Sequence, residues 1–401
     1  MFVAVVLCGA GASIAAATRS DRALWLNPAS PGALVEYSIN SDGTGRTQIS
    51  DFGPQVDQHL SGDAYPFFTL SRSQDGSEFS MGGLYVGSPG VGYPSTTMGL
   101  SQLVPSQYTA WPYFGVGNPD FGGANAVFSP DGTWIAFTIY KCFEEGCSSD
   151  CQKDCADSNV YVEKTDGTAL HEAAPNATSP TWSADGKWLT YQGFAGNAAF
   201  GTYTGVYVVR RNGEGRKRIV INGSYPVFAP RGSLLAYRCG GKLPAPGGGA
   251  GHVWRPSVCV ATRNGSGKRV IATGYAHSPL PFVWSPDATK IAITVPDPNQ
   301  VDPTYYGHLV VLSVTGAKPV NVLRAARIQA PLAWSPDSRH IAYLAQTLSQ
   351  DVNTDHAVYV ASTTTHHSTF ITDDPVSFSD IQWANKTRLT YLTFLHASPF
   401  P

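Results

Sequence analysis

Short runs of alternating apolar and polar residues recur along the chain, and each follows the same kind of tight turn. In the clearest copies an aromatic or apolar segment enters Ser-Pro-Asp-Gly, and an alternating strand such as Trp134–Thr138 follows. Proline fixes φ for the turn, aspartate caps it, and glycine supplies φ > 0. Five segments share this pattern: Ala126–Tyr140, Pro180–Phe194, Tyr225–Cys239, Phe282–Val295 and Leu332–Ala345.

Two weaker copies flank these five, at Leu70–Met81 and Ile381–Phe394, and successive copies are 46 to 56 residues apart. Each interval leaves room for a third strand, such as Asn159–Val162, and a fourth, such as Arg218–Ile221. Four antiparallel strands in about 50 residues make one blade of a β-propeller. The repeat therefore predicts an all-β fold of four-stranded antiparallel blades.

The two ends of the chain complement each other. Residues 33–49 have the pattern of a third and fourth strand without a first half, and Ile381–Phe394 supplies a first and second strand without a second half. Pairing them completes one blade and leaves no open sheet edge between the termini. This predicts seven blades closed by N-terminal strands on the C-terminal blade, or six if the copy at Leu70 is not a true repeat.

Composition supports this fold class and removes one class of partner. The chain has 401 residues, of which 42% are hydrophobic and 14% charged, with 41 Gly and 29 Pro. Few charges and many turn formers and aromatics favour β-structure over helices. The net charge of −2 gives no general electrostatic reason to bind nucleic acid, so we expect no nucleic-acid partner.

The N-terminus has the pattern of a signal peptide. Residues 2–17 are apolar and small, and Ala15 and Ala17 give a small-x-small cleavage pattern. We therefore expect a signal peptide at 1–17, a single propeller domain at 18–401, and an extracytoplasmic location. A short buried strand is the alternative for this run, which falls short of the about 20 residues of a stable membrane span.

The cysteines predict disulfides rather than a metal site. Loss of the leader removes Cys8 and leaves six cysteines, an even number. Cys239 and Cys259 flank a Gly/Pro loop, and a bridge there is worth roughly 3 kcal/mol in the chain-entropy model. The other four are Cys142, Cys147, Cys151 and Cys155, whose spacing lacks the paired C-x2-C of zinc sites. They predict two local disulfides, and all three connectivities are open. Disulfides persist in oxidising compartments, so the cysteines indicate an extracytoplasmic location.

The repeat resembles the TolB-like propellers, the WD40-like PD40 family. The resemblance rests on Trp284-Ser-Pro-Asp287 and Trp334-Ser-Pro-Asp337, on the Ile-Ala continuations at Ile135, Ile291 and Ile341, and on the turn Asn40–Gly45. It covers nearly the whole mature chain and implies the propeller fold. It implies little about function, because the family includes interaction scaffolds, peptidase-associated propellers and a few lyases. We expect no counterpart of the separate N-terminal domain of TolB, so the resemblance does not imply the role of TolB in envelope maintenance.

One face of the predicted ring holds all the long insertions. The turns between first and second strands and between third and fourth strands are short and share one face. The other face carries the insertions 88–125, 140–158, 193–204, 240–256, 296–307 and 346–356. Long loops on a rigid scaffold are the usual place for binding, so we expect the functional surface there.

Aromatic residues and histidines mark this surface as a candidate binding site. Aromatics are enriched at interface hot spots and sugar-stacking platforms, and histidine serves both catalysis and metal binding. The candidates are Tyr108, Trp111, Tyr113, Phe114, Tyr140, Tyr203, Trp254, Tyr305, Tyr306, His252 and His277. The aromatics alternatively pack the loops onto the scaffold. The histidines, with His59, His308 and His356, lack metal-ligand spacing and are alternatively ordinary loop residues.

No cofactor is expected. Acidic residues crowd the cysteine-rich loop, where they fit either a structural Ca²⁺ ion or a solvated acidic loop: Glu144, Glu145, Asp150, Asp154 and Asp157. The sequence has no G-x-S-x-G nucleophile motif, no dinucleotide motif and no H-E-x-x-H.

Two functions fit these observations. The preferred hypothesis is a non-catalytic secreted or periplasmic propeller that binds a protein or a cell-surface polymer through the insertion face. The alternative is a polysaccharide lyase or hydrolase with its site at the mouth of the central channel on the same face. Converging histidines and carboxylates would favour the enzyme.

Overall fold

Every element described in the computed structural model is a β-strand. The structure describes residues 22–25, 32–54, 67–72, 79–81, 85–87, 114–116, 127–142, 155–164, 168–195, 202–244, 252–274, 282–296, 307–326, 328–346, 356–372 and 376–396. The all-β prediction is confirmed for this part of the chain.

The strands form seven antiparallel sheets, which we call blades 1 to 7. Blade 1 contains β1 (Arg22–Trp25), β4 (Phe67–Arg72), β5 (Phe79–Met81) and β6 (Tyr85–Gly87). Blade 2 contains β7 (Phe114–Val116), β8 (Val127–Phe128), β9 (Trp134–Cys142), β10 (Cys155–Lys164) and β11 (His171–Ala174). Blade 3 contains β12 (Ala177–Trp182), β13 (Trp188–Ala195), β14 (Thr202–Arg210) and β15 (Lys217–Ile221).

The remaining four blades follow the same order. Blade 4 contains β16 (Ser224–Phe228), β17 (Leu234–Pro244), β18 (His252–Thr262) and β19 (Arg269–Thr273). Blade 5 contains β20 (Val283–Trp284), β21 (Lys290–Pro296), β22 (Gly307–Ser313) and β23 (Val320–Ala326). Blade 6 contains β24 (Ile328–Trp334), β25 (His340–Gln346), β26 (His356–Ser362) and β27 (Ser368–Thr372). Blade 7 contains β28 (Val376–Trp383), β29 (Arg388–His396), β2 (Gly32–Asn40) and β3 (Thr47–Pro54).

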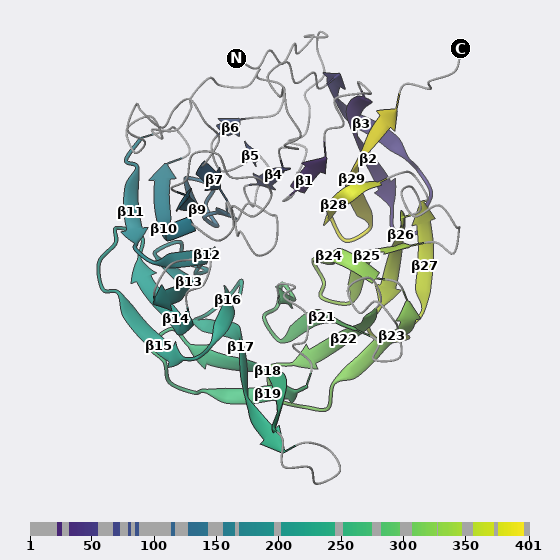
Figure 1. Ribbon diagram of the computed structural model, residues 1–401. Coiled ribbons are helices and arrows are strands. Elements are labelled where there is room, and N and C mark those ends of the chain that lie inside the picture. The colour runs from purple at the N-terminus through teal and green to yellow at the C-terminus, as the bar shows by residue number, and fades with distance from the viewer. Residues whose placement is uncertain are drawn as a thin grey trace.

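The blades are arranged as a ring, and blade 7 joins the two ends of the chain (Figure 1). Strand β2 pairs with β29 from Gly32 opposite His396 to Asn40 opposite Arg388. First strands such as β12 and β16 lie nearest the centre, and fourth strands such as β15 and β27 lie on the outer rim (Figure 1). The predicted closure by N-terminal strands is confirmed.

The Ser-Pro-Asp turns have the predicted geometry. In blade 5, Ser285 Oγ donates to Asp287 Oδ1 over 2.6 Å and accepts from Lys290 N over 3.0 Å. Partial burial raises the pKa of Asp287, but hydrogen bonds from Ser285 and Thr289 outweigh this, and the pKa lies below its ordinary value. The turns at Ser129, Ser183 and Ser335 repeat the bond to aspartate.

In several blades, a tryptophan at the end of the first strand forms a hydrogen bond to the preceding blade. Its indole Nε1 donates to a backbone oxygen of the neighbouring first strand, over 2.9 to 3.1 Å. The pairs are Trp182 with Val127, Trp284 with Val227, Trp334 with Val283, and Trp383 with Ala333. The buried apolar clusters likewise lie between neighbouring blades, so the core is a set of blade interfaces.

Two blades contain strands that the repeat did not predict. In blade 1, the N-terminal strand β1 pairs with β4, with Arg22 opposite Leu70. In blade 2, β7 and β8 pair with different parts of β9, so β9 has two short partners along one edge. Neither β1 nor β7 is followed by the Ser-Pro-Asp turn that made the other first strands recognisable.

Candidate functional site

The strand ends define two faces of the ring. On one face, which we call the loop face, second strands end and third strands begin: Cys142 and Cys155, Ala195 and Thr202, Pro244 and His252, Pro296 and Gly307, Gln346 and His356. The turn face, opposite, carries the short Ser-Pro-Asp turns and the turns between third and fourth strands. Sheet pairing extends into three of the predicted insertions, 140–158, 193–204 and 240–256, so these loops are shorter than the sequence suggested.

Five of the predicted binding residues lie on described strands, all at the loop-face ends. Tyr140 is near the end of β9, and Phe114 in β7 pairs with Lys141 beside it. Tyr203 is near the start of β14, and His252 and Trp254 are at the start of β18. The other six lie outside the described residues: Tyr108, Trp111, Tyr113, His277, Tyr305 and Tyr306.

The hairpin of β17 and β18 carries two of these residues beyond the neighbouring blades (Figure 1). Its register runs without interruption from Leu234 opposite Thr262 to Pro244 opposite His252. The predicted disulfide between Cys239 and Cys259 is present, with the two Cα atoms 5.8 Å apart. The disulfide lies in the part of the hairpin that belongs to the blade. His252 and Trp254 lie at the other end of the hairpin, where β18 begins.

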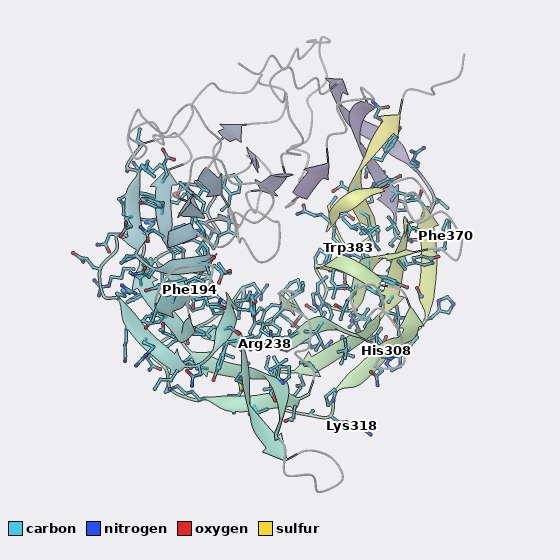
Figure 2. The ribbon with its side chains drawn as sticks, in the orientation of Figure 1. Phe194, Arg238, His308, Lys318, Phe370 and Trp383 are labelled. Atoms are coloured by element: carbon cyan, nitrogen blue, oxygen red, sulfur yellow. A yellow bond between two sulfur atoms is a disulfide. The ribbon has the colours of Figure 1, made fainter. Side chains whose placement is uncertain are left out.

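A polar cluster lies where blades 3 and 4 meet on the loop face. The backbone N–H of Tyr225 donates to Oε1 of the buried Gln192 over 2.8 Å. The Arg238 guanidinium carbon lies 6.0 Å from the centre of the Tyr225 ring. Figure 2 shows Arg238 nearer the centre of the ring than Lys318 or Phe370. The cluster combines a cation, a phenol and an amide on the inner side of the ring.

The backbone of this cluster is strained. Tyr225 has φ 50° and Ser179, at the same position of β12, has φ 54°. Both precede a proline, which disfavours helical conformations, and the left-handed region costs about 1–2 kcal/mol for a residue with a side chain. Strain of this kind often occurs at functional sites. The repeat pattern did not predict this cluster, although the Ser179-Pro180 and Tyr225-Pro226 pairs inside first strands are visible in the sequence.

The structure does not test the proposed metal and cysteine chemistry of the 140–158 insertion. Cys142 and Cys155 are opposite each other in the register of β9 and β10, whereas Cys147 and Cys151 lie outside the described residues. The side chains of the acidic residues predicted to hold Ca²⁺ lie outside the described part as well: Glu144, Glu145, Asp150, Asp154 and Asp157.

The histidines of the loop face come from separate blades. His252, His308 and His356 lie at the starts of the third strands of blades 4, 5 and 6. Among the described residues, no group of three or more His, Cys, Asp or Glu side chains is placed to hold a metal ion. His59 and His277 lie outside this part of the chain. Within the ranges given above, no helix has the length and apolarity needed to cross a membrane.

Comparisons with known proteins identify similar structures but no family. No family model matches the sequence, and a comparison with curated protein sequences finds no match. A putative TolB from Agrobacterium tumefaciens is 13% identical with a TM-score of 0.44, over 91% of this chain and 99% of that one. TolB from Acinetobacter baumannii is 11% identical with a TM-score of 0.42, over 91% and 66%. Oligogalacturonate lyase from Vibrio parahaemolyticus is 9% identical with a TM-score of 0.49, over 86% and 97%.

These similarities carry no argument about function at such identities and TM-scores. The strand order and the closure of blade 7 establish the fold, and a fold by itself does not fix a function.

Proposed function

We propose that this protein is an extracytoplasmic, non-catalytic β-propeller that binds a protein or a cell-envelope polymer through its loop face. The observation that carries the proposal is the position of Phe114, Tyr140, Tyr203 and Trp254 at one end of three neighbouring blades. Aromatic side chains supply large contact areas at protein interfaces and stacking platforms for sugars. The disulfide of blade 4 and the apolar segment at 2–17 support a secreted chain.

The test combines three substitutions on the loop face with an aromatic control elsewhere. Tyr140→Ala/Tyr203→Ala/Trp254→Ala removes the candidate contacts, and Phe370→Ala removes a ring that is 49% exposed on the outer rim. Binding is measured by co-sedimentation with peptidoglycan, chitin, cellulose and xylan. A benzophenone amino acid at position 254 detects protein partners by crosslinking. Thermal unfolding of each variant checks that the fold is intact.

The proposal expects at least about a tenfold loss of binding in the triple variant and unchanged binding in Phe370→Ala. Equal binding by the triple variant and the unmodified protein would contradict it. So would the absence of both a sedimenting polymer and a crosslinked protein.

A second candidate function is polysaccharide cleavage, which the cluster of Gln192, Tyr225 and Arg238 favours. An arginine pairs well with the carboxylate of an acidic sugar, and a phenol can transfer a proton. Incubation with polygalacturonate, followed by reducing-end assay and by the ultraviolet absorbance of an unsaturated product, tests this. Turnover that Arg238→Ala abolishes would establish an enzyme and overturn the non-catalytic proposal.

A further inference from the structure

Although the net charge of the chain is near neutral, the basic and acidic residues are distributed unevenly along it. Residues 187–274, which form most of blades 3 and 4, contain 13 of the 27 Lys and Arg residues and 1 of the 29 Asp and Glu residues. Blade 4 has Arg231 at the turn position where blades 2, 3, 5 and 6 have Asp131, Asp185, Asp287 and Asp337. Proximity of like charges destabilises a compact fold, so such a concentration requires an explanation.

Most of these cations lie on one stretch of the outer rim, at the turn face. The turn between β14 and β15 and the start of β15 contain five cations in the nine residues 210–218, and the equivalent segment of blade 4 contains three in 263–269. We call these eight the cationic rim: Arg210, Arg211, Arg216, Lys217, Arg218, Arg263, Lys268 and Arg269. This surface lies on the face of the ring opposite the loop face.

Contacts between the blades bring the two segments together. Lys217 Nζ donates to the backbone oxygen of Asn264 over 3.3 Å. The guanidinium carbons of Arg210 and Arg263 lie 5.4 and 4.8 Å from the centre of the same Trp188 ring. The segments therefore form one surface across the boundary between blades 3 and 4.

Few carboxylates neutralise this surface. Arg263 pairs with Asp185 over 3.4 Å, and it is the one member of the cationic rim with an ion pair among the described residues. Glu214 is the one acidic residue within the two segments, and it is exposed. Arg218 and Lys268 are exposed as well. Arg211 lies within electrostatic range of Asp131 in blade 2. The exposed cations without an ion pair among the described residues are therefore those at 210, 216–218 and 268–269.

Protection of the sheet edge does not account for them. Charged residues often keep edge strands from pairing with other chains. The outer strands β23 and β27 are edges too, and Val320 and Phe370 there are 39% and 49% exposed. Yet the turn before β23 has one cation, Lys318, and the turn before β27 has no Lys or Arg. Figure 2 shows Lys318 and Phe370 on this part of the outer rim.

We propose that the cationic rim is a docking surface for an acidic, extended segment of a partner polypeptide. Six of its eight members are arginines, and five of these make no ion pair among the described residues. Arginine pairs with carboxylates in a bidentate manner. Ile221 and Val270 on the same two strands are 66% and 53% exposed. A polypeptide supplies both carboxylates and apolar side chains, whereas a nucleic acid or a sulfated polysaccharide matches the cations alone. The outer edges of β15 and β19 offer backbone groups to an added strand.

The test measures binding of short fluorescein-labelled peptides by fluorescence anisotropy. One peptide alternates Glu with Val, a second contains Glu alone, and a third alternates Lys with Val. Arg218→Glu/Lys268→Glu reverses two exposed charges of the rim. Lys318→Glu/Lys386→Glu makes the same change in charge at exposed positions of blades 5 and 7, and serves as the matched control.

The proposal expects the Glu-Val peptide to bind the unmodified protein and the Lys-Val peptide not to bind. Affinity should fall about tenfold or more between about 20 and 200 mM NaCl, because exposed charges are screened. The rim variant should lose about tenfold in affinity and the control variant less than about twofold. Ile221→Ser should weaken the Glu-Val peptide and leave the all-Glu peptide unchanged.

Three results would overturn the proposal. Equal losses in the two double variants would reduce the effect to net charge. Heparin or duplex DNA that binds about tenfold tighter than the Glu-Val peptide, without any effect of Ile221→Ser, would assign the rim to a polyanion. Self-association in low salt that the rim variant abolishes, seen by light scattering, would assign it to a second copy of the chain.

Discussion

At the residue scale, the turn motif shows both the reach and the limit of the sequence pattern. The pattern predicted φ > 0 at glycine, and Gly186 and Gly232 have φ 63° and 73°. Ala288 and Ser338 hold the same position with φ 60° and 59°, although neither is glycine. The surrounding hydrogen bonds impose this conformation, since Ala288 N still donates to Ser285 O over 2.8 Å. Residue propensity alone does not reveal such strain.

Ala288→Gly should therefore stabilise the protein by about 1 kcal/mol, because glycine adopts the left-handed region without the steric cost of a Cβ atom. Urea unfolding at neutral pH measures the difference. The reverse change Gly232→Ala is the matched control, since a Cβ there has no atom within 4 Å and only the backbone conformation opposes it. It should destabilise by a similar amount. Changes of the same sign in the two variants would refute the explanation.

At the scale of elements, strands were easier to predict than their ends. Alternation and the repeated turn identified the strands of blades 3 to 6, but 240–256 was expected to be a loop, and the structure continues β17 to Pro244 and begins β18 at His252. Glycine and proline mark a loop in sequence, whereas the pairing of two long neighbours decides where a hairpin ends. The five predicted binding residues on strands were placed on the correct face because strand order alone fixes it.

The tryptophan that precedes the Ser-Pro-Asp turn also has a role that sequence periodicity did not indicate. Trp334 is buried and its indole donates to Val283 O over 2.9 Å, so it joins blade 6 to blade 5. Trp334→Phe removes this bond and should destabilise by about 1–3 kcal/mol, because the buried carbonyl loses a partner. Chemical denaturation measures it.

Trp188→Phe is the comparison, since the Trp188 indole N–H makes no hydrogen bond among the described residues and Phe keeps a ring beneath Arg263. It should cost less than about 1 kcal/mol. A loss in Trp188→Phe as large as that in Trp334→Phe would assign the effect to ring size rather than to the bond between blades.

At the scale of the whole molecule, the ring topology followed from the sequence but the distribution of charge did not. Complementary half-blades at the two ends were visible in the pattern, and β2 pairs with β29 as expected. The sequence pattern did not indicate the cationic rim, because the net charge of −2 is a sum over the whole chain. In addition, its arginines lie in turns that the repeat already explains by their geometry. Only the fold shows that two such turns are neighbours, joined by Lys217 and Asn264.

Closure of the ring should make distant blades unfold together. Tyr391 in β29 is fully buried, stacks on Tyr37 of β2 at 5.8 Å, and its hydroxyl accepts a bond from Arg46 Nε over 3.0 Å. Tyr391→Ala should cost about 3–5 kcal/mol, as for other large buried aromatics. In an open array of repeats the loss would stay near blade 7. In a closed ring, Tyr391→Ala should also lower the protection of the Val258 and Val260 amides in blade 4 against hydrogen exchange. The loss of protection, expressed as a free energy, should equal the loss in the free energy of global unfolding. Exchange that accelerates only in β2, β3, β28 and β29 would show that the blades open independently and that joining the termini does not couple them.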